Sequence, residues 1–397
     1  MSVRRALVGS ALALALPASL LISTGQSVAA PASQTVAARA KTSTVSLRSL
    51  PQIAQQGAKA AAASKARATF VGAVKPAKAG RTVSLQLKSG SSWKTLAKGR
   101  TKANGSYELS GAARSGGVYR VSSPAYKGAR AASSATVGVD QWLTPTFSDE
   151  FSGTKLSSQW VHRGGNYEPQ SMRKCSKTSP KATKVRGGTL RLSVLKDSSR
   201  KTKCKIRKNG RTGKYFYRLN GHVGTQGTYS FRYGYAAARM KMQKQRGQHG
   251  GFWMQPVTGA GIGGPAKTHG AEIDVVEYFG EQANGGMASF VYSRNSKGKL
   301  VKTGGWLKGT NKFLANKKDK WWKNYHVFSV EWTPKAYTFR IDGQEVWRTT
   351  KGVSGVAQYP IVSLLSSDYE IPGLGNEKRL PQHAYVDWVR VWETPQP

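Results

Sequence analysis

The sequence predicts an all-β protein whose larger part is one two-sheet antiparallel β-sandwich of the jelly-roll type. Between residue 139 and the C-terminus, apolar and polar residues alternate along short segments, as they do in half-buried strands. The clearest segments are 190–194, 238–242, 326–332, 337–341 and 385–392. No stretch of this region has the spacing of an amphipathic helix, and roughly 250 residues of such strands fit a single jelly roll.

The N-terminus has the features of a secretory signal peptide. Two basic residues, Arg4 and Arg5, precede an apolar run over 6–22, and small residues suited to cleavage follow at 27–29. The apolar run is shorter than the roughly 20 residues that a membrane-spanning helix needs. We therefore expect a cleaved signal peptide at 1–29, a secreted, extracellular protein and no membrane span.

Two further regions are expected between the signal peptide and the large sandwich. Residues 30–68 are rich in Ala, Ser, Thr, Gln and Lys and nearly free of aromatic residues, which predicts a disordered tether. In residues 69–138, alternation at 83–87 and a turn signal, Asn-Gly, predict several short strands. This region resembles the small immunoglobulin-like β-sandwiches that accompany secreted proteins, and the large sandwich then occupies 139–397.

The chain is strongly basic, with 62 Lys and Arg against 19 Asp and Glu and a formal net charge of +43. This charge predicts attraction to anionic polymers of a cell wall or matrix, including sulfated polysaccharides. The basic residues are spread along the whole chain and form no nucleic-acid-binding motif, so a dedicated nucleic-acid partner is not expected. A monomer is expected.

The two cysteines, Cys175 and Cys204, both lie in the predicted large sandwich. In an exported chain such a pair is expected to form a disulfide. Two cysteines alone cannot complete a closed zinc site.

Three carboxylates lie in one predicted strand. Residues 272–277 read Glu-Ile-Asp-Val-Val-Glu, so strict alternation places Glu272 and Asp274 on one face and Glu277 on the other. A β-bulge at the adjacent Val275 and Val276 would add one residue and return Glu277 to the face of the other two acids. In a chain with so few acids, three on one short strand favour chemistry over a solvated acidic face or a calcium site.

The spacing of the two glutamates fits a retaining glycosidase. Four effective strand steps separate their backbones by about 13 Å. Side chains that lean inward bring the carboxyl groups to about 5.5 Å apart, the separation typical of retaining enzymes. One Glu then attacks the sugar and the other protonates the leaving oxygen, while Asp274 between them keeps one group protonated. No cofactor is needed for this chemistry.

The same stretch resembles the active-site motif of glycoside hydrolase family 16, in the bulged form of the laminarinase-like β-glucanases. Other segments resemble that family in the same order along the chain, namely 147–151, 165–170, 233–241, 252–254, 331–334 and 387–391. The resemblance covers about 147–392. It implies a concanavalin A-like jelly roll and a glycoside hydrolase.

The resemblance also implies roles for individual residues. Glu272 resembles the nucleophile, Asp274 the assisting carboxylate and Glu277 the acid/base. The residues expected to bind substrate, with Trp253 as a sugar-stacking wall, are Trp253, Asn166, Glu168, His249 and Tyr278. A structural calcium away from the cleft is implied as well, and its expected ligands are Asp387, Glu150 and the backbone at Gly188.

The substrate stays open, because the chain departs from the family at positions that contact sugar. His249, Gly250 and Gly251 stand where laminarinases commonly have Trp-Pro-Ala, and 289–292 replaces a Thr-Val-His-Tyr run. The leading hypothesis is endo-hydrolysis of a β-1,3- or mixed-linked β-glucan. The alternatives are the same chemistry on an anionic galactan of agar or carrageenan type, transglycosylation and, among non-enzymes, a polysaccharide-binding protein.

Overall fold

The computed structural model describes residues 40–60, 65–208, 211–258, 264–282 and 285–395. Nearly all regular structure in these ranges is β-strand, and the only α-helix among them is the single turn α1 (Ala266–His269). The prediction of an all-β protein is therefore confirmed. No helix in the described ranges is long and apolar enough to cross a membrane. The signal peptide expected at 1–29 lies outside the described residues.

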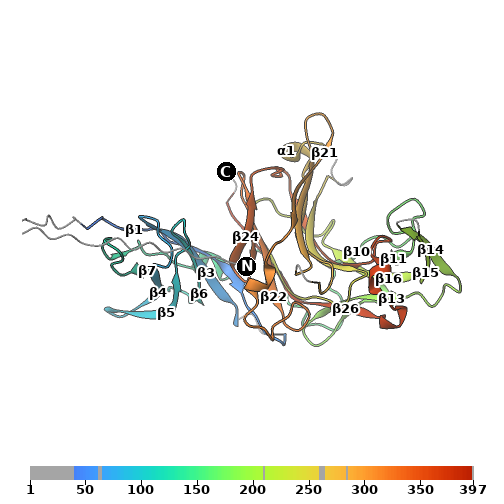
Figure 1. Ribbon diagram of the computed structural model, residues 1–397, viewed down its shortest axis with the longest axis horizontal. Coiled ribbons are helices and arrows are strands. Elements are labelled where there is room, and N and C mark those ends of the chain that lie inside the picture. The colour runs from blue at the N-terminus through green and yellow to red at the C-terminus, as the bar shows by residue number, and fades with distance from the viewer. Residues whose placement is uncertain (1–39, 61–64, 209–210, 259–263, 283–284, 396–397) are drawn as a thin grey trace, which may run out of the picture. The chain divides into compact units, whose positions relative to one another are not determined.

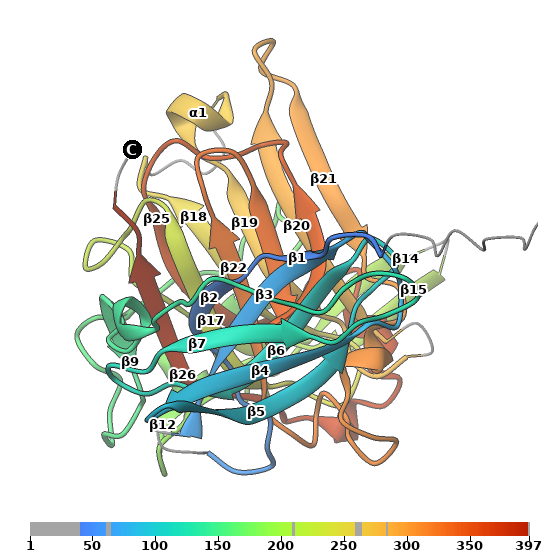
Figure 2. The same ribbon diagram turned by 90° about the vertical axis from the view of Figure 1, so that its left-hand side faces the viewer.

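The large sandwich consists of two antiparallel sheets, called here the front sheet and the back sheet (Figure 1). The front sheet runs, in order of neighbouring strands, through β21 (Leu300–Trp306), β20 (Met287–Arg294), β19 (Glu272–Tyr278), β18 (His249–Pro256), β25 (Gln358–Leu365) and β16 (Arg218–Gly224). The back sheet runs through β13 (Leu190–Lys196), β26 (Gln382–Glu393), β17 (Gly234–Lys241), β22 (His326–Trp332), β23 (Tyr337–Ile341) and β24 (Gln344–Thr349). Figure 2 shows β18, β19, β20 and β21 side by side.

Short elements complete the sandwich. β9 (Phe147–Asp149) pairs with β26, β10 (Val161–His162) and β11 (Ser176–Thr178) pair with β16, and β12 (Thr183–Val185) pairs with β13. β14 (Lys203–Lys208) and β15 (Arg211–Phe216) form a separate hairpin. The 3₁₀ helices are η2 (Asp140–Trp142), η3 (Pro180–Ala182), η4 (Thr310–Phe313), η5 (Ile371–Leu374) and η6 (Glu377–Arg379).

Strand β16 joins the two sheets. Its first residues, from Arg218 to Asn220, pair with β13 of the back sheet, and its last residues, from Gly221 to Gly224, pair with β25 of the front sheet. Gly221 stands at the change of partner, where a Cβ atom would lie 2.7 Å from the carbonyl oxygen of Ala182. Because no other residue fits this close approach, the transition between the sheets depends on glycine.

The two sheets enclose one apolar core. The front sheet contributes Phe252, Ile273 and Val362, among others, and Val330 and Val389 face them from the back sheet. Burial of one such side chain contributes about 1.5–3 kcal/mol. Since side chains alternate along a strand, the residues between these core positions in the front sheet point to its outer face.

Residues 44–54 form strands, so the tether predicted for 30–68 is wrong for this segment. β1 (Thr44–Val45) and β2 (Arg48–Ala54) pair with β3 (Arg67–Lys75). Leu50 and Ile53 are fully buried against aromatic and aliphatic side chains on the outer face of the back sheet. The prediction relied on the scarcity of aromatic residues within the segment, whereas its aromatic partners come from strands far along the chain.

A small two-sheet sandwich is present in the region predicted to contain one. One of its sheets holds β1, β2, β3 and β6 (Ser106–Ala112). The other holds β5 (Ser92–Arg100), β4 (Thr82–Ser89), β7 (Tyr119–Ser123) and β8 (Ala132–Ser133). Phe70, Leu85, Tyr107 and Tyr119 belong to its own core. The sandwich begins at β1 rather than near residue 69, and its likeness to immunoglobulin modules stays a prediction.

Arg239 connects the N-terminal segment to the back sheet and provides a test of that connection. Its buried guanidinium pairs with Asp387 and donates to the backbone oxygens of Gln55 (2.7 Å) and Lys59 (3.1 Å).

Arg239→Ala leaves Asp387 buried without its arginine partner, so we expect the free energy of unfolding to fall by about 3–5 kcal/mol in urea titrations. Arg100→Ala, which removes one exposed bond to the Gly80 oxygen, is the control and should change it by less than about 0.5 kcal/mol. Equal losses in the two variants would contradict this account.

Candidate active site

Strand β19 contains the β-bulge that the sequence predicts. Against β18, Phe252 pairs with Val276 and Trp253 with Asp274, which leaves Val275 without a counterpart. The ladder to β20 is interrupted at the same place, between Asp274 and Glu277. Ser289 on β20 lies opposite the interruption, and its hydroxyl donates to the Asp274 backbone oxygen (2.8 Å). The bulge is therefore present in both ladders, and the Ser289 hydroxyl holds it in place.

The bulge sorts the side chains of β19 into apolar and acidic sets. Val275 and Val276 both belong to the core between the sheets. Glu272, Asp274 and Glu277, called here the acidic triad, share the outer face of the front sheet. The structure thus brings together the three residues predicted to be catalytic.

The members of the acidic triad repel one another. Asp274 is almost fully buried, and burial together with the charges of Glu277 and Glu272 raises its pKa well above the usual range, against an opposing effect of Lys302. Burial also raises the pKa of Glu277; His249 and Arg173 oppose this shift, whereas Glu370 and Glu272 add to it. Asp274 therefore keeps its proton above the pH at which an ordinary aspartate loses it, and Glu277 is favoured as a proton donor.

Glu272 is oriented by Gln255, which the sequence analysis did not single out. The Gln255 side-chain amide donates to Glu272 Oε2 (2.8 Å). Its own oxygen accepts from Arg163 (2.7 Å) and from the Tyr359 hydroxyl (3.1 Å), so the amide nitrogen is the atom that faces Glu272. The sequence contained a signal for the position of Gln255, because side chains alternate along a strand and Gln255 lies two residues after Trp253 on the same face of β18.

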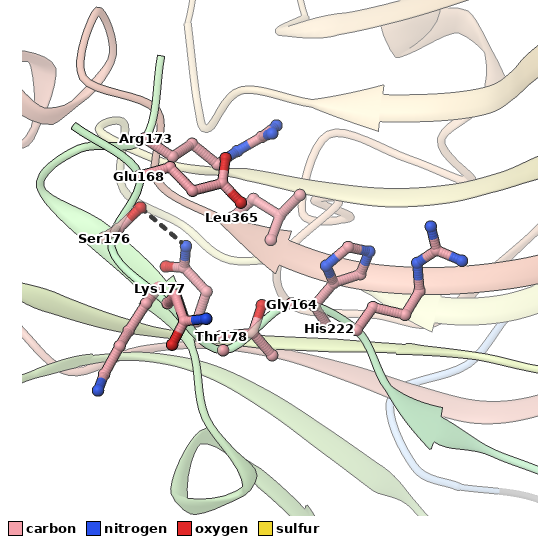
Figure 3. A pocket seen from close by; sticks show the side chains of 12 residues that line it. Gly164, Glu168, Arg173, Ser176, Lys177, Thr178, His222 and Leu365 are labelled. Atoms are coloured by element: carbon pink, nitrogen blue, oxygen red, sulfur yellow. Dashed lines mark hydrogen bonds between the residues drawn. The ribbon is translucent and has the colours of Figure 1, made fainter. Parts of the chain in front are cut away.

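Trp253, Asn166 and Glu168 lie on the outer side of the front sheet. The Trp253 ring is half-buried, stacks on His222 with 5.6 Å between ring centroids and donates to the Ser363 hydroxyl (3.0 Å). Asn166 and Glu168 are exposed and line a depression that also includes His222 (Figure 3). The basic side chains at this depression are Arg163, Arg173 and Lys177. Burial, with Arg163 and Arg173 nearby, lowers the pKa of His222 well below its ordinary value, so this ring is neutral.

Two residues predicted to bind substrate are buried. Tyr278 is only 1% exposed and packs in the core, so that prediction is wrong. The reason is alternation: once the bulge turns Glu277 outward, the next residue must point inward. His249 is 5% exposed and its ring lies between Glu277 and Glu370, where it is not open to a sugar hydroxyl.

The donor set expected for calcium does not fit that ion. Asp387 pairs with Arg239, and Glu150 accepts two bonds from Arg390, at 2.7 and 2.8 Å. A guanidinium on each carboxylate takes the place and the charge of a bound cation. The described part of the chain also holds no cluster of three or more His, Cys, Asp or Glu side chains suited to a metal.

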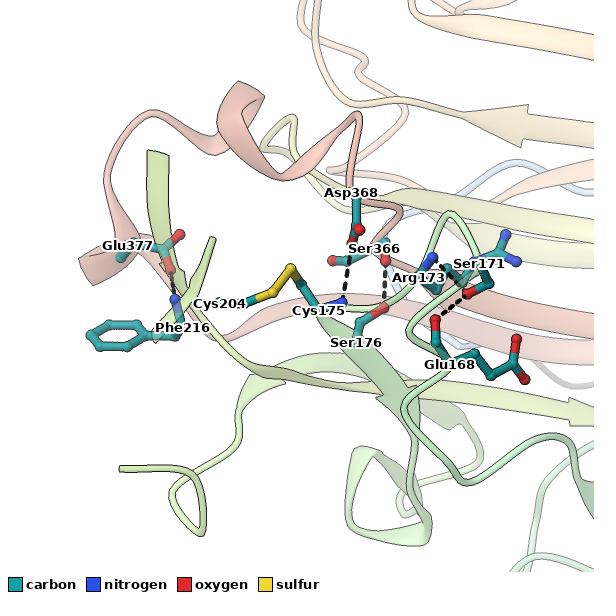
Figure 4. The surroundings of a disulfide bond; sticks show 10 residues. All are labelled: Glu168, Ser171, Arg173, Cys175, Ser176, Cys204, Phe216, Ser366, Asp368 and Glu377. Carbon is teal, nitrogen blue, oxygen red and sulfur yellow. Dashed lines mark hydrogen bonds between the residues drawn. A yellow bond between two sulfur atoms is a disulfide. The ribbon is translucent and has the colours of Figure 1, made fainter. Parts of the chain in front are cut away.

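The predicted disulfide between Cys175 and Cys204 is confirmed, with its Cα atoms 5.6 Å apart. The Cys175 backbone N–H donates to Asp368 (3.1 Å), and the Asp368 N–H donates to the Met172 oxygen (2.7 Å). Figure 4 shows this disulfide beside Arg173 and the segment with Ser366 and Asp368. The loop that carries Arg173 is thereby fastened to the segment that carries Glu370.

The fold and the acidic triad describe a carbohydrate-active enzyme, and comparison with known families agrees. The model of the GH16 domain of β-porphyranases A–D matches residues 142–394. This match spans more than half of the chain, which therefore belongs to that family within glycoside hydrolase family 16, and the protein is a glycoside hydrolase. The family resemblance predicted from the sequence is confirmed.

Several solved structures are similar to the chain. The laminarinase catalytic domain of Thermotoga maritima is 19% identical over 64% of this chain and 99% of its own, with a TM-score of 0.49. The endo-β-1,3-glucanase of Pyrococcus furiosus is 21% identical over 64% and 95%, with a TM-score of 0.46. LamAcat of Zobellia galactanivorans is 18% identical over 63% and 98%, with a TM-score of 0.48. No curated protein matches the chain.

The raised pKa of Asp274 predicts how stability changes with pH. The unfolded-state pKa of an aspartate is about 3.9. When the folded-state pKa is higher, the carboxyl stabilises the fold fully below about pH 3.9, and this contribution is lost as the pH rises through the folded-state pKa. Asn cannot ionise, so Asp274→Asn should gain stability relative to the wild type as pH rises above about 4, by up to about 1.4 kcal/mol per pH unit. Urea unfolding at several pH values measures the difference.

The control for this prediction is an aspartate whose pKa shifts the other way. Burial alone would raise the pKa of Asp197, but hydrogen bonds from Ser199 and Tyr167 lower it. Asp197→Asn should therefore lose stability relative to the wild type as pH rises from acid toward neutral. The same pH trend in both variants would contradict the assignment for Asp274.

Proposed function

We propose that the protein is a secreted, retaining endo-glycanase that cleaves an anionic galactan by double displacement. The proposal is carried by the acidic triad, which the bulge in β19 aligns on one face. A depression lined with basic side chains lies on the same side of the sandwich, and its Arg163 bonds to Gln255, the residue that orients Glu272. Glu272 is the nucleophile, Glu277 the acid/base and Asp274 the assisting carboxylate.

The reaction follows from these positions. Glu272 forms a bond to the anomeric carbon while the glycosidic bond breaks, and the departing oxygen takes the proton of Glu277. A water molecule then gives its proton to Glu277, and its oxygen attacks the anomeric carbon and releases the Glu272 carboxylate. The net result is hydrolysis with retained configuration, and both glutamates return to their starting states.

Local contacts support this division of roles. Burial raises the pKa of Glu277, which suits a proton donor. Glu272 receives a hydrogen bond from the fixed amide of Gln255, which orients one carboxylate oxygen and leaves the other available for attack. Burial and the two neighbouring glutamates raise the pKa of Asp274, which limits the negative charge next to the nucleophile.

The basic depression favours an anionic polymer over a neutral one. Arg163, Arg173 and Lys177 line it, and Glu168 is the only carboxylate among the described residues at its wall. A sulfate or carboxylate on the sugar would gain charge-assisted hydrogen bonds there. The family match to β-porphyranase domains supports the same choice. Hydrolysis of a β-1,3- or mixed-linked β-glucan is the competing outcome.

Removal of either glutamate tests the catalytic assignment. In Glu272→Gln and Glu277→Gln, kcat for reducing ends released from porphyran, carrageenan, agarose, laminarin and lichenan should fall by about 10²–10⁴-fold. Glu345→Gln, on β24 of the back sheet, is the control and should keep wild-type activity. Comparable turnover in wild type and either catalytic-site variant would refute the mechanism.

NMR of the first product should show the β-anomer, whereas an initial α-anomer would exclude retention.

A lysine at the depression tests the substrate class. Lys177→Gln should raise KM for sulfated galactan by about 3- to 10-fold at low salt, because one attractive charge is lost, while kcat stays within a factor of about two. The difference should shrink as ionic strength rises. Lys94→Gln, at an exposed position of β5, is the control. The glucan hypothesis replaces the galactan one if only laminarin or lichenan is cleaved.

A further inference from the structure

Behind Glu277, one imidazole is enclosed between two carboxylates. His249 Nδ1 lies 2.9 Å from both carboxylate oxygens of Glu370, and His249 Nε2 lies 3.7 Å from Oε1 of Glu277. The ring is 5% exposed and packs at 5.2 Å, centroid to centroid, against Phe279. The mechanism proposed above uses neither His249 nor Glu370.

The fold fixes both ends of this arrangement. Gly251 is the residue of β18 that pairs with Glu277, and His249, two positions earlier, is the diagonal neighbour on the same face. Glu370 comes from the turn between β25 and η5, where the Ser367 backbone N–H donates to its Oε2 (2.9 Å). The imidazole is thus held by a strand on one side and by a hydrogen-bonded turn on the other.

Two flanking carboxylates favour the charged form of the ring. A neutral imidazole has one donor and one acceptor nitrogen, whereas both nitrogens of an imidazolium are donors and both here face carboxylate oxygens. Burial by itself lowers the pKa of His249, but Glu370 and Glu277 outweigh it and raise that pKa, with Arg173 opposing. Glu370 supplies the partner that a buried cation requires.

We propose that His249, held by Glu370, is a positioning residue that keeps a positive charge beside Glu277 and stabilises the Glu277 carboxylate after its proton has passed to the leaving group. The inference rests on the proposed function, because that function assigns the acid/base role to Glu277. When Glu277 gives up its proton it becomes a largely buried anion, and an imidazolium 3.7 Å away offsets the cost of that charge. His249 exchanges no proton itself, and the proton of the attacking water returns to Glu277.

Other charged or titratable groups face the same place and remain in the test variants. They are Glu272 and Asp274 on β19, Arg173 on the disulfide-linked loop, His222 on β16, Tyr292 on β20, Tyr369 beside Glu370, and Lys302 on β21, which acts on Asp274. A change confined to His249 or Glu370 therefore reports on that pair.

The first measurement asks whether the ring carries its charge. In ¹⁵N NMR of the full chain, both His249 nitrogens should show the imidazolium signature above pH 6.5, the ordinary histidine pKa. In Glu370→Gln the ring should titrate about one pH unit lower or more, since one of its two anionic partners is gone. A wild-type ring that titrates at or below pH 6.5, or an unchanged titration in Glu370→Gln, would overturn the proposal.

The second measurement asks what the charge does to Glu277. In ¹³C NMR, with the Glu277 signal assigned by its loss in Glu277→Gln, the pKa of Glu277 should rise by about one unit or more in His249→Gln. The alkaline limb of kcat/KM on porphyran, or on laminarin if only that is cleaved, should move upward by the same amount. His249→Asn is the second variant should His249→Gln fail to fold, and circular dichroism checks folding.

A matched histidine elsewhere separates this role from plain structural support. His326 on β22 of the back sheet also lies between two carboxylates, with Nδ1 2.8 Å from Asp342 and Nε2 3.4 Å from Asp319. His326→Gln should lower the melting temperature without moving the pKa of Glu277 or the pH profile. If Glu277→Gln is inactive but His249 variants leave the pKa of Glu277 unchanged, the inference on His249 fails alone. If Glu277→Gln keeps its activity, the proposed function fails.

Discussion

The direction of the Glu277 side chain depends on one extra residue in β19. Without Val275 as an unpaired residue, alternation would turn Glu277 into the core and Val276 toward solvent. With the bulge, Val276 joins Val275 in the core, and its burial contributes about 1.5–3 kcal/mol. That apolar gain offsets the cost of crowding three carboxyls onto the opposite face, where Asp274 lowers the cost further by keeping its proton. The same local irregularity therefore satisfies the core and assembles the site.

The groups that tune the acidic triad come from two kinds of element. Gln255 and His249 are on β18, next to β19 in the front sheet, so the ladder fixes their positions. Arg173 and Glu370 are on connecting segments, whose position is less constrained by the sheet. The hydrogen bonds of Asp368 compensate, because they bind the two segments to each other, and the disulfide joins the first of them to Cys204 on β14. Charges that act on Glu277 over a few ångströms require this fixation, since electrostatic effects change steeply with distance.

Much of this arrangement could be predicted from the sequence, and the failures have physical causes. The alternating strand pattern predicted the sandwich, and two adjacent valines between acids predicted the bulge. Tyr278 was misplaced because alternation was not followed one residue past the bulge. The contact between His249 and Glu370 could not be predicted from the sequence, because Glu370 follows His249 by 121 residues and only the pairing of β18 with β25 brings the two together. Residues 44–54 were misread because their burial depends on a surface that another part of the chain provides.

The chain has a large excess of lysine and arginine, so the absence of an ion pair between these residues and the acidic triad, among the described residues, needs a reason. Several acids elsewhere in the described chain are paired with arginine, among them Glu331 with Arg48, Glu377 with Arg218 and Glu150 with Arg390. No lysine or arginine of the described residues forms such a pair with the acidic triad, and its cationic partner is a histidine at 3.7 Å from Glu277. An arginine at that place would hold Glu277 ionised and remove it as a proton donor. Lysine and arginine side chains that act across solvent are screened beyond about 10 Å, so they do not replace that effect. A histidine supplies a weaker and more distant charge, which permits Glu277 to be protonated before the glycosidic bond breaks and to be stabilised as an anion afterwards.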